Sequence, residues 1–256
     1  MKINKSYDIL NSKVNHALIL SLKGDKMANV GHKKKYEEVK IKILCSANKL
    51  FLQKGYQLTT VMDIAKEAGV DKNSVFYIFK DKETLLSMIV KYVFDFQYQK
   101  ASKLILGKTD DALLLYAVET ALQLHIAESS EHIREMYNVS YSFRKSTEVI
   151  YQTVTKKLQD IFGSYKPQFE TKDFYELEIA VGGIMRSYLS VPCDIYFTME
   201  RKVKRYLETV FSIFGIPEKQ IEDAYNFVCS FNFNEITQQI TNKMLIYIED
   251  KIKGEL

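Results

Sequence analysis

The sequence predicts an all-α protein made of two helical parts, a small N-terminal one and a larger C-terminal one. Hydrophobic residues make up 46% of the 256 residues, which is typical of a chain with a packed core. The chain has only 10 glycines and 3 prolines, so helix-breaking residues lie far apart. Apolar residues recur at helical spacing along most of the chain, and the alternation typical of strands is scarce.

Residues 1–32 form an extension before the first well-defined helix. A short apolar run from Ala17 to Leu22 follows several lysines, but a secretory signal needs a longer apolar region and a small-residue cleavage site. Two interpretations stay open. The extension is either a flexible basic arm, or the natural start is Met27 and the preceding residues are absent from the native protein.

Residues 33–86 predict a compact domain of short helices. A helix from about Lys34 ends at Lys54, because Gly55 follows it as a stop signal. Its apolar face comprises Ile43, Leu44, Ala47, Leu50 and Phe51. A second helix begins after Thr59 or Thr60. Asp63, three residues after Thr60, forms a weak capping box there.

The second helix ends at a tight turn. Gly69 breaks it, and Asp71 caps a third helix with Val75, Phe76 and Phe79 as expected core residues. Asp81 then caps a longer helix whose apolar positions are Leu85, Leu86, Ile89, Val90 and Val93. A helix, a glycine turn and a short second helix form the layout of a helix-turn-helix, whose second helix enters the major groove of DNA.

The charge distribution supports this interpretation. The net formal charge is +4, but residues 33–80 carry +5 and residues 1–32 carry +3, which leaves −4 on residues 81–256. The positive charge therefore lies with the helix-turn-helix, where a phosphate backbone needs it.

The start of the third helix carries the side chains that can read DNA. Lys72 can meet a guanine edge or a phosphate, Asn73 can pair with adenine, and Ser74 can serve either purpose. Tyr77 is placed to donate its hydroxyl to a phosphate. Thr60 stands at a helix N-terminus, where backbone N–H groups can hold another phosphate.

From about Lys40 to Leu86 the chain resembles the TetR family of bacterial transcriptional regulators. The matching residues are Ile43, Ala47, Leu50, Phe51, Gly55, Thr59, Thr60, Ile64, Ala65, Ala68, Gly69, Val70, Tyr77, Phe79, Lys80, Lys82, Glu83, Leu85 and Leu86. The resemblance implies an all-α homodimer in which a three-helix N-terminal domain reads a palindromic operator. It also implies a larger helical domain that dimerises and binds a small ligand, which usually releases the DNA. By position, the family's DNA contacts map to Thr60, Lys72, Asn73, Ser74, Phe76, Tyr77 and Lys82.

Three residues depart from the family pattern. The family usually has glycine at Asn73, tyrosine at Phe76 and histidine at Ile78. Phe76 lacks the hydroxyl, which puts a phosphate contact there in doubt. Ile78 either touches a thymine methyl group or packs inward, and Asn73 adds a candidate base reader. We expect these differences to affect the preferred operator sequence.

Residues 87–256 predict the larger helical domain. Amphipathic segments lie near 109–127, 130–143, 145–163, 170–191, 196–214, 217–230 and 234–253. In the segment 170–191, one stripe is apolar, and a second one is made of small residues. The apolar stripe comprises Phe174, Leu177, Val181, Ile184, Tyr188 and Val191, and the small stripe comprises Ala180, Gly183 and Ser187. The last helix has a drifting apolar stripe that would pack on the body or on a second subunit, formed by Ile236, Ile240, Met244, Ile248 and Ile252.

The adjacent Gly182 and Gly183 each cost about 1 kcal/mol in a helix interior, which a close approach of another helix or a ligand could offset. This helix either crosses the domain or lines a ligand pocket or the dimer seam. Candidate pocket residues, which combine apolar bulk with a polar tip or carry a charge, are Tyr116, His125, Tyr137, Tyr141, Tyr151 and Arg186. Arg186 can instead form an ion pair with Glu176 or Glu178.

Other classes of site are not expected. Cys45, Cys193 and Cys229 are widely spaced, and the four histidines have no metal-ligand spacing, so we expect no disulfide framework, metal or cofactor. No apolar run reaches the ~20 residues that span a membrane, and we expect a cytoplasmic protein. Nucleophile motifs, phosphate-binding glycine loops and acid–base pairs are also absent from the sequence, which argues against an enzyme.

The leading hypothesis is therefore a ligand-responsive homodimeric repressor that binds a palindromic DNA operator and an unknown small-molecule effector. An activator, or a regulator controlled by a protein partner, remains open within the same class. An enzyme with an accessory DNA-binding head and a purely structural helical protein are the alternatives from other classes.

Overall fold

A computed structural model of the chain describes residues 30–255, and its regular structure within this range is entirely helical. The helices are α2 (Val30–Lys54), α3 (Val61–Ala68), α4 (Lys72–Phe79), α5 (Lys82–Ile105), α6 (Ala112–Glu128), α7 (Glu131–Ser140), α8 (Arg144–Phe162), the 3-10 turn η1 (Gly163–Tyr165), α9 (Thr171–Ser190), α10 (Met199–Phe214), α11 (Glu218–Cys229) and α12 (Phe233–Glu255). This confirms the all-α prediction. The predictions about residues 1–29, including a start at Met27, lie outside the described residues.

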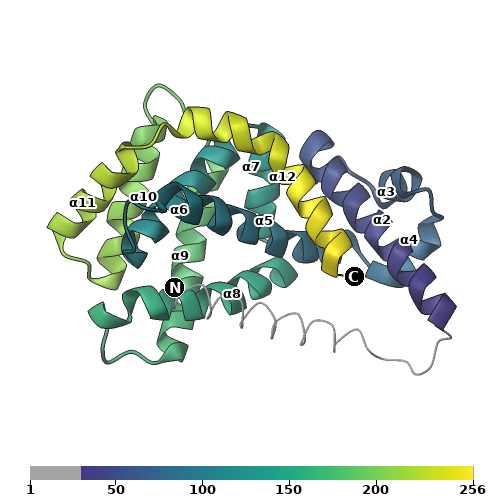
Figure 1. Cartoon of the computed structure of the whole chain (residues 1–256), viewed down its shortest axis with the longest axis horizontal. Helices are drawn as coiled ribbons and strands as arrows, with labels where there is room; N and C mark the ends of the chain where they lie inside the picture. Colours follow the sequence, from purple (N-terminus) through teal and green to yellow (C-terminus); the bar gives the residue numbers. More distant parts are fainter. Residues whose placement is uncertain (1–29, 256) are drawn as a thin grey trace.

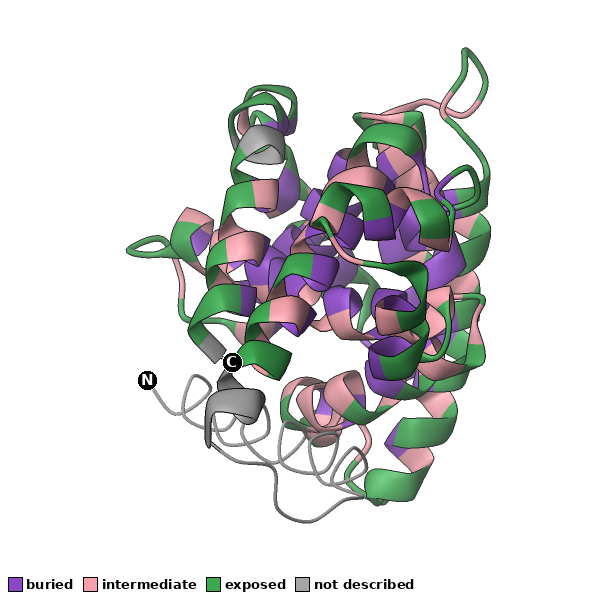
Figure 2. Ribbon diagram, turned by 90° about the vertical axis from the view of Figure 1, so that its right-hand side faces the viewer, coloured by how far each residue is buried: buried purple, intermediate pink, exposed green. Residues whose placement is uncertain are grey.

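The helices α2, α3 and α4 form a small head at one end of the molecule, and α5 leads from it into a larger body (Figure 1). Buried residues gather on the inner sides of the helices, and exposed ones cover the outside (Figure 2). Helix α6 is the most enclosed, with 13 of its 17 residues buried. Within the described part, no helix has both the length and the apolar character that a membrane crossing requires.

The turns of the head follow from its caps. Gly55 and Gly69 adopt left-handed conformations with φ of +87° and +66°, as expected for glycines that end helices. The Oγ of Thr60 accepts a hydrogen bond from the backbone N–H of Asp63, and the Asp63 carboxylate accepts one from the Thr60 N–H. The predicted capping box is therefore confirmed, although aspartate takes the place of the usual glutamate.

Helix α9 is rotated relative to the prediction. Its buried residues are Phe174, Glu178, Val181, Gly182, Met185 and Leu189. The predicted stripe is partly wrong, because Leu177 is only half-buried and Val191 is 49% exposed. Leu177 and Glu178 lie on neighbouring faces of the helix. The sequence pattern predicted that the face with the apolar Leu177 is buried, because Glu178 is charged. Burial against α7, α8 and α10 selects the other face.

Helix α12 joins the body to the head. It crosses the body and packs against both α5 and α2 (Figure 1). Met244, Ile248 and Ile252 of the predicted stripe are fully buried. The Tyr247 hydroxyl contacts Asp95 and lies 2.7 Å from the amide nitrogen of Gln99 on α5. The sequence predicted that this helix packs on the body or on a second subunit. The structure shows it packed on the body and also on α2, the first helix of the head.

Candidate functional site

Helix α4 presents one polar face to solvent. Lys72 and Asn73 are exposed at its start, and Tyr77, one turn later, is 82% exposed. On the opposite face, Val75, Ile78 and Phe79 are buried. A short helix with a buried inner face and an exposed polar outer face can enter a groove of DNA without losing its support.

Phe76 was predicted to be a core residue, and this is wrong. Its side chain is 42% exposed, and the Lys72 ammonium lies 5.4 Å from the centre of its ring. Position 76 is one turn from position 72 and therefore shares its outward face. Ile78 packs inward, which decides between the two alternatives for that residue.

Two of the predicted DNA contacts take part in helix caps, Thr60 as the capping residue of α3 and Ser74 as a partner of the α4 cap Asp71. The Ser74 hydroxyl donates to the Asp71 carboxylate at 2.7 Å, and the Thr60 hydroxyl donates to Asp63 at 2.9 Å. The pKa of Asp63 falls to about 2 because Lys54 and Thr60 both donate hydrogen bonds to its carboxylate. These bonds hold the N-termini of α3 and α4 in a defined direction, with their first N–H groups at the surface of the head.

Lys82 is half-buried and hydrogen-bonded to the backbone of the head. Its amine donates to the backbone oxygens of Tyr56 at 2.6 Å and Thr59 at 2.9 Å, and it lies 4.1 Å from the centre of the Tyr56 ring. Burial lowers the pKa of this amine. Lys82 therefore holds the turn between α2 and α3 against the start of α5, and a phosphate contact would require it to leave these two carbonyls.

Two exposed apolar residues beside Thr60 were missed by the sequence reasoning. Leu58 is 67% exposed and Met62 is 64% exposed, so both can make apolar contacts with a ligand of the head. Hydrophobicity alone assigns such residues to a core. In the sequence, only their position on either side of the capping residue Thr60 indicates that these side chains are exposed.

The head is bound to the body by the middle of α7 and the start of α8. The Glu135 carboxylate accepts a hydrogen bond from the Gln57 backbone N–H at 2.8 Å. The Lys145 amine donates to Asp81 at 2.5 Å and to Thr84 at 2.7 Å, both at the start of α5. These contacts connect the head to the helices of the body.

The body contains a cavity of about 50 Å³ among α5, α6, α8, α9 and α10. It is lined by Phe94, Tyr116, Glu119, Thr120, Gln123, Tyr141, Val154, Lys157, Glu178, Val181, Gly182, Met185 and Tyr206. The amide nitrogen of Gln123 donates to the Tyr141 hydroxyl at 3.1 Å, and Lys157 pairs with Glu119. Aromatic walls with a few convergent polar groups are typical of a small-molecule site.

Of the six predicted pocket residues, Tyr116 and Tyr141 line this cavity. Tyr151 adjoins it, because one of its ring carbons lies 3.4 Å from the position that a Cβ on Gly182 would take. Tyr137 is buried elsewhere and donates its hydroxyl to Gln97 on α5. Gly182 shows the close approach expected of the glycine pair, whereas Gly183 has open space around it.

His125 and Arg186 are not among the residues that line the cavity. His125 stacks on Phe233 of α12 at 4.8 Å between ring centres, and burial lowers its pKa to about 4. It lies two residues after Gln123, which turns it to another side of α6. Arg186 is exposed on the outer face of α9, away from the buried Glu178.

The sequence reasoning missed Glu178, Lys157 and Tyr206 as cavity residues. Glu178 was considered only as an ion-pair partner of Arg186. Its spacing of four residues after Phe174 and three before Val181 places it on their face, and this spacing was the available signal.

Known proteins resemble this chain in sequence and in fold. Residues 43–89, which cover most of the head and the start of α5, match the family model described as bacterial regulatory proteins of the tetR family. YttP of Bacillus subtilis strain 168, named a probable HTH-type transcriptional regulator, is 30% identical over 166 residues. That match covers 64% of this chain and 73% of YttP.

Two further matches differ in how much of the chain they cover. IcaR of Staphylococcus aureus strain Newman, a negative transcriptional regulator of a biofilm operon, is 41% identical over 58 residues, or 23% of this chain, which spans only 31% of IcaR. The crystal structure of RolR in complex with resorcinol has a TM-score of 0.58 at 14% identity and covers 77% of this chain and 95% of RolR. At this identity, the match shows a shared fold that includes the body. The chain thus belongs to the TetR family of DNA-binding, helix-turn-helix transcriptional regulators, which are not enzymes.

Proposed function

We propose that this regulator is a homodimeric repressor that binds a palindromic operator and releases it when a small molecule occupies the body. Residues 33–86 act as the DNA-reading domain, and residues 87–256 act as the ligand-binding and dimerisation domain. The proposal rests on the exposed row of side chains on α4. This row is polar, and it lies in the part of the chain that carries the net positive charge.

The residues of that row have separate tasks. Lys72 and Asn73 stand at the N-terminal end of α4, which enters the major groove first, so they meet base edges. The exposed Tyr77 hydroxyl binds a phosphate. At the N-termini of α3 and α4, the Thr60 and Ser74 hydroxyls donate to phosphates in place of the Asp63 and Asp71 carboxylates that they bind in the free head. Phe76 makes apolar contacts, and Lys82 supports the turn on which this surface rests.

The cavity in the body supports the ligand-responsive part of the proposal. RolR, whose fold is similar, was crystallised in complex with resorcinol, which supports a small-molecule effector for this chain. Tyr116 and Tyr141 line the cavity of the body. The effector of this protein occupies the cavity between α6 and α9.

The connection from cavity to head runs through the junction of α7 and α8. Tyr141 lines the cavity, and two residues later Phe143 packs on Tyr56 of the head with 5.5 Å between ring centres. Lys145 then binds Asp81 at the start of α5. A ligand that displaces Tyr141 therefore shifts the contacts that orient α4.

The outer face of α9 is the proposed dimer seam. Tyr175 and Ile179 are 42% and 44% exposed on it, and the exposed Gly183 continues the same face. A small residue at that position lets a second helix approach closely. The variant Gly183→Glu has room within one subunit, so it should leave the fold intact and dissociate the dimer.

Genome-wide mapping of bound DNA tests the central claim. We expect a small set of palindromic sites, bound by the purified protein as a dimer and released by a metabolite of the neighbouring genes. Light scattering at micromolar concentration should show a dimer. A strict monomer, or uniform binding to all DNA, would contradict the proposal.

A further inference from the structure

Glu178 is a buried acid that the fold itself does not use. Its side chain is 3% exposed in the middle of α9, and its Oε2 atom has no hydrogen-bond partner among the described residues. Buried carboxyl oxygens are ordinarily paired, because leaving one unpaired costs free energy. The carboxyl group lines the cavity of the body, so a bound molecule is the partner that it lacks.

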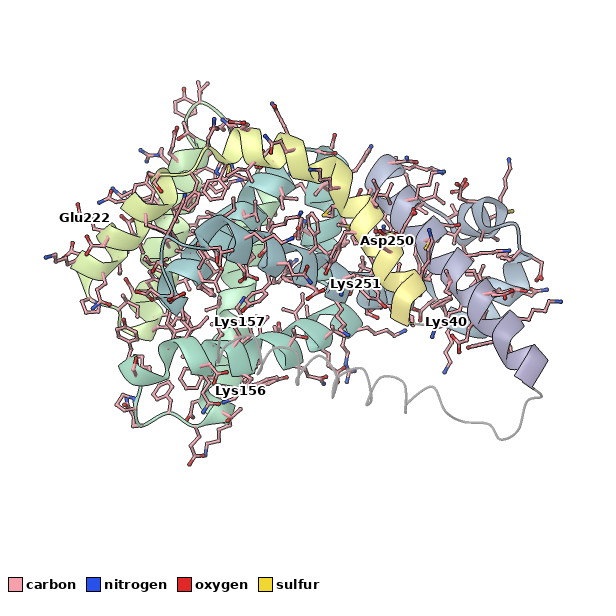
Figure 3. The ribbon with its side chains drawn as sticks, viewed as in Figure 1. Lys40, Lys156, Lys157, Glu222, Asp250 and Lys251 are labelled. Carbon is pink, nitrogen blue, oxygen red and sulfur yellow. The ribbon has the colours of Figure 1, made fainter. Side chains whose placement is uncertain are left out.

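The cavity contains more acidic than basic groups. Lys157 on α8 pairs with Glu119 on α6, and it is also the cation that acts on Glu178. Figure 3 shows Lys157 on the side of α8 that faces the body, whereas its neighbour Lys156 lies on the outer side. One amine thus faces two carboxyl groups, and ionised Glu178 would leave the site one positive charge short.

The other titratable groups around Glu178 stay neutral. Tyr116 on α6, Tyr141 after α7, Tyr151 on α8 and Tyr206 on α10 all have raised pKa values, chiefly because of burial. Burial also raises the pKa of Glu178 to about 8, against the opposing effect of Lys157. At neutral pH the empty cavity therefore holds Glu178 mostly protonated.

The walls of the cavity suit a cation as well. Tyr116, Tyr141, Tyr206 and Phe94 contribute aromatic rings, whose faces attract positive charge in an environment with little water. An anion would meet two carboxyl groups and only one amine, which is already paired. A neutral alcohol would leave Glu178 protonated, so it would form no ion pair with this group.

We propose that the cavity binds a small organic ammonium cation with a compact apolar body, and that Glu178 is its counter-ion. This inference rests on the proposed function and names the chemical class of its effector. Because about 50 Å³ holds only one or two water molecules, the ligand must widen the cavity. The α9 backbone at Gly182 lies close to the rings of Tyr141 and Tyr151, so these rings must move.

Matched probes test the charge requirement. Benzylamine, benzyl alcohol and benzoate share one body and differ in charge, as do butylamine, butanol and butyrate. At concentrations tenfold above Kd, a bound amine should raise the melting temperature of the full-length dimer by about 3–5 °C. The alcohols and carboxylates should produce no shift. The proposal fails if no amine binds at millimolar concentration, or if the alcohols bind as well as the amines.

Proton release tests the role of Glu178 directly. Binding of an ammonium ion ionises the acid, so calorimetry in two buffers of different ionisation enthalpy should show nearly one proton released per site at about pH 6.5. Glu178→Gln should abolish both the release and the binding of amines. Glu176→Gln, on the exposed face of the same helix, should change neither. Amine binding that persists in Glu178→Gln would overturn the proposal.

Operator binding separates this inference from the proposed function. If both variants bind palindromic DNA as dimers but amines have no effect, the regulator stands and the ligand class is wrong. If neither the native protein nor the variants select specific DNA, the proposed function itself fails, whatever the amines do.

Discussion

Replacing Gly55 by alanine tests how the head is held on the body. Gly55 has a φ of +87°, a conformation that an L-residue with a side chain adopts only with strain. A Cβ there would also lie 2.4 Å from Glu135 Oε2 and 3.1 Å from His132 Nδ1. Because the first distance is far below van der Waals contact, the Glu135 carboxylate has to move.

The magnitude follows from these two effects. The left-handed conformation costs an alanine about 1–2 kcal/mol. Displacing Glu135 breaks its 2.8 Å hydrogen bond to the Gln57 N–H. A bond to a charged group contributes about 1.5–3 kcal/mol, and solvent exposure places this one at the lower end. We therefore expect Gly55→Ala to lower the free energy of unfolding by about 3 kcal/mol in total.

Gly69 supplies the matched control. Its φ is +66°, but no atom lies within 4 Å of its added Cβ. Gly69→Ala should therefore carry only the conformational cost of about 1–2 kcal/mol. In thermal unfolding, the two variants should differ by roughly 3–6 °C, with Gly55→Ala the less stable.

A double-mutant cycle identifies the cause. In a Glu135→Ala background the main steric conflict is gone and only the 3.1 Å approach to His132 Nδ1 remains, so the cost of Gly55→Ala should fall close to that of Gly69→Ala in the native background. Equal effects of the two alanine substitutions in the native protein would refute the reasoning. So would an excess cost of Gly55→Ala over Gly69→Ala that stays undiminished after the removal of Glu135.

Three further predictions concern DNA binding and pH. Asn73→Ala should change the base preference at one operator position, whereas Tyr77→Phe should weaken all operators about equally, as measured by binding to a library of operator variants. Operator affinity should fall by at least about tenfold between 50 and 200 mM salt, because phosphate contacts release counterions. For Glu178, the folded pKa of about 8 lies above its ordinary value, so the folded state keeps a proton that the unfolded state has lost. The native protein should therefore lose stability relative to Glu178→Gln as the pH rises from about 5 to 8.

Each of these predictions has an outcome that contradicts it. Circular dichroism must show that Asn73→Ala and Tyr77→Phe retain the folded head, and identical binding profiles of the two variants would then refute the separate tasks. An affinity independent of salt would exclude binding through phosphates. A melting-temperature difference between the native protein and Glu178→Gln that stays constant over this pH range would show that Glu178 titrates normally.

The local structure of the head was predictable because each signal lies within a few residues. Thr60 with Asp63, Gly69 and Asp71 define where α3 and α4 begin and end, and the structure confirms each of them. The helices of the body were also predicted to within a few residues, because long apolar periodicity and isolated prolines mark them clearly.

Contacts between distant segments were not predictable. Lys82 matched a DNA-contacting position of the family, but only the fold shows the two carbonyl oxygens that hold its amine. Phe76 has the hydrophobicity of a core residue, and the phase of α4 turns it outward. His125 and Arg186 resembled pocket residues by type, yet the rotation of α6 and α9 leaves neither in the cavity lining.

By itself, the sequence determined the helices, their caps, the charge of the reading head and the family, because these depend on neighbouring residues and their order. Only the tertiary structure decided that Glu178 lines a cavity of the body together with Lys157 and that the α7–α8 junction connects this cavity to the head. The physical reason is burial. A charged residue in a helical pattern predicts an exposed face, and only the packing of α9 against its neighbours places this one inside.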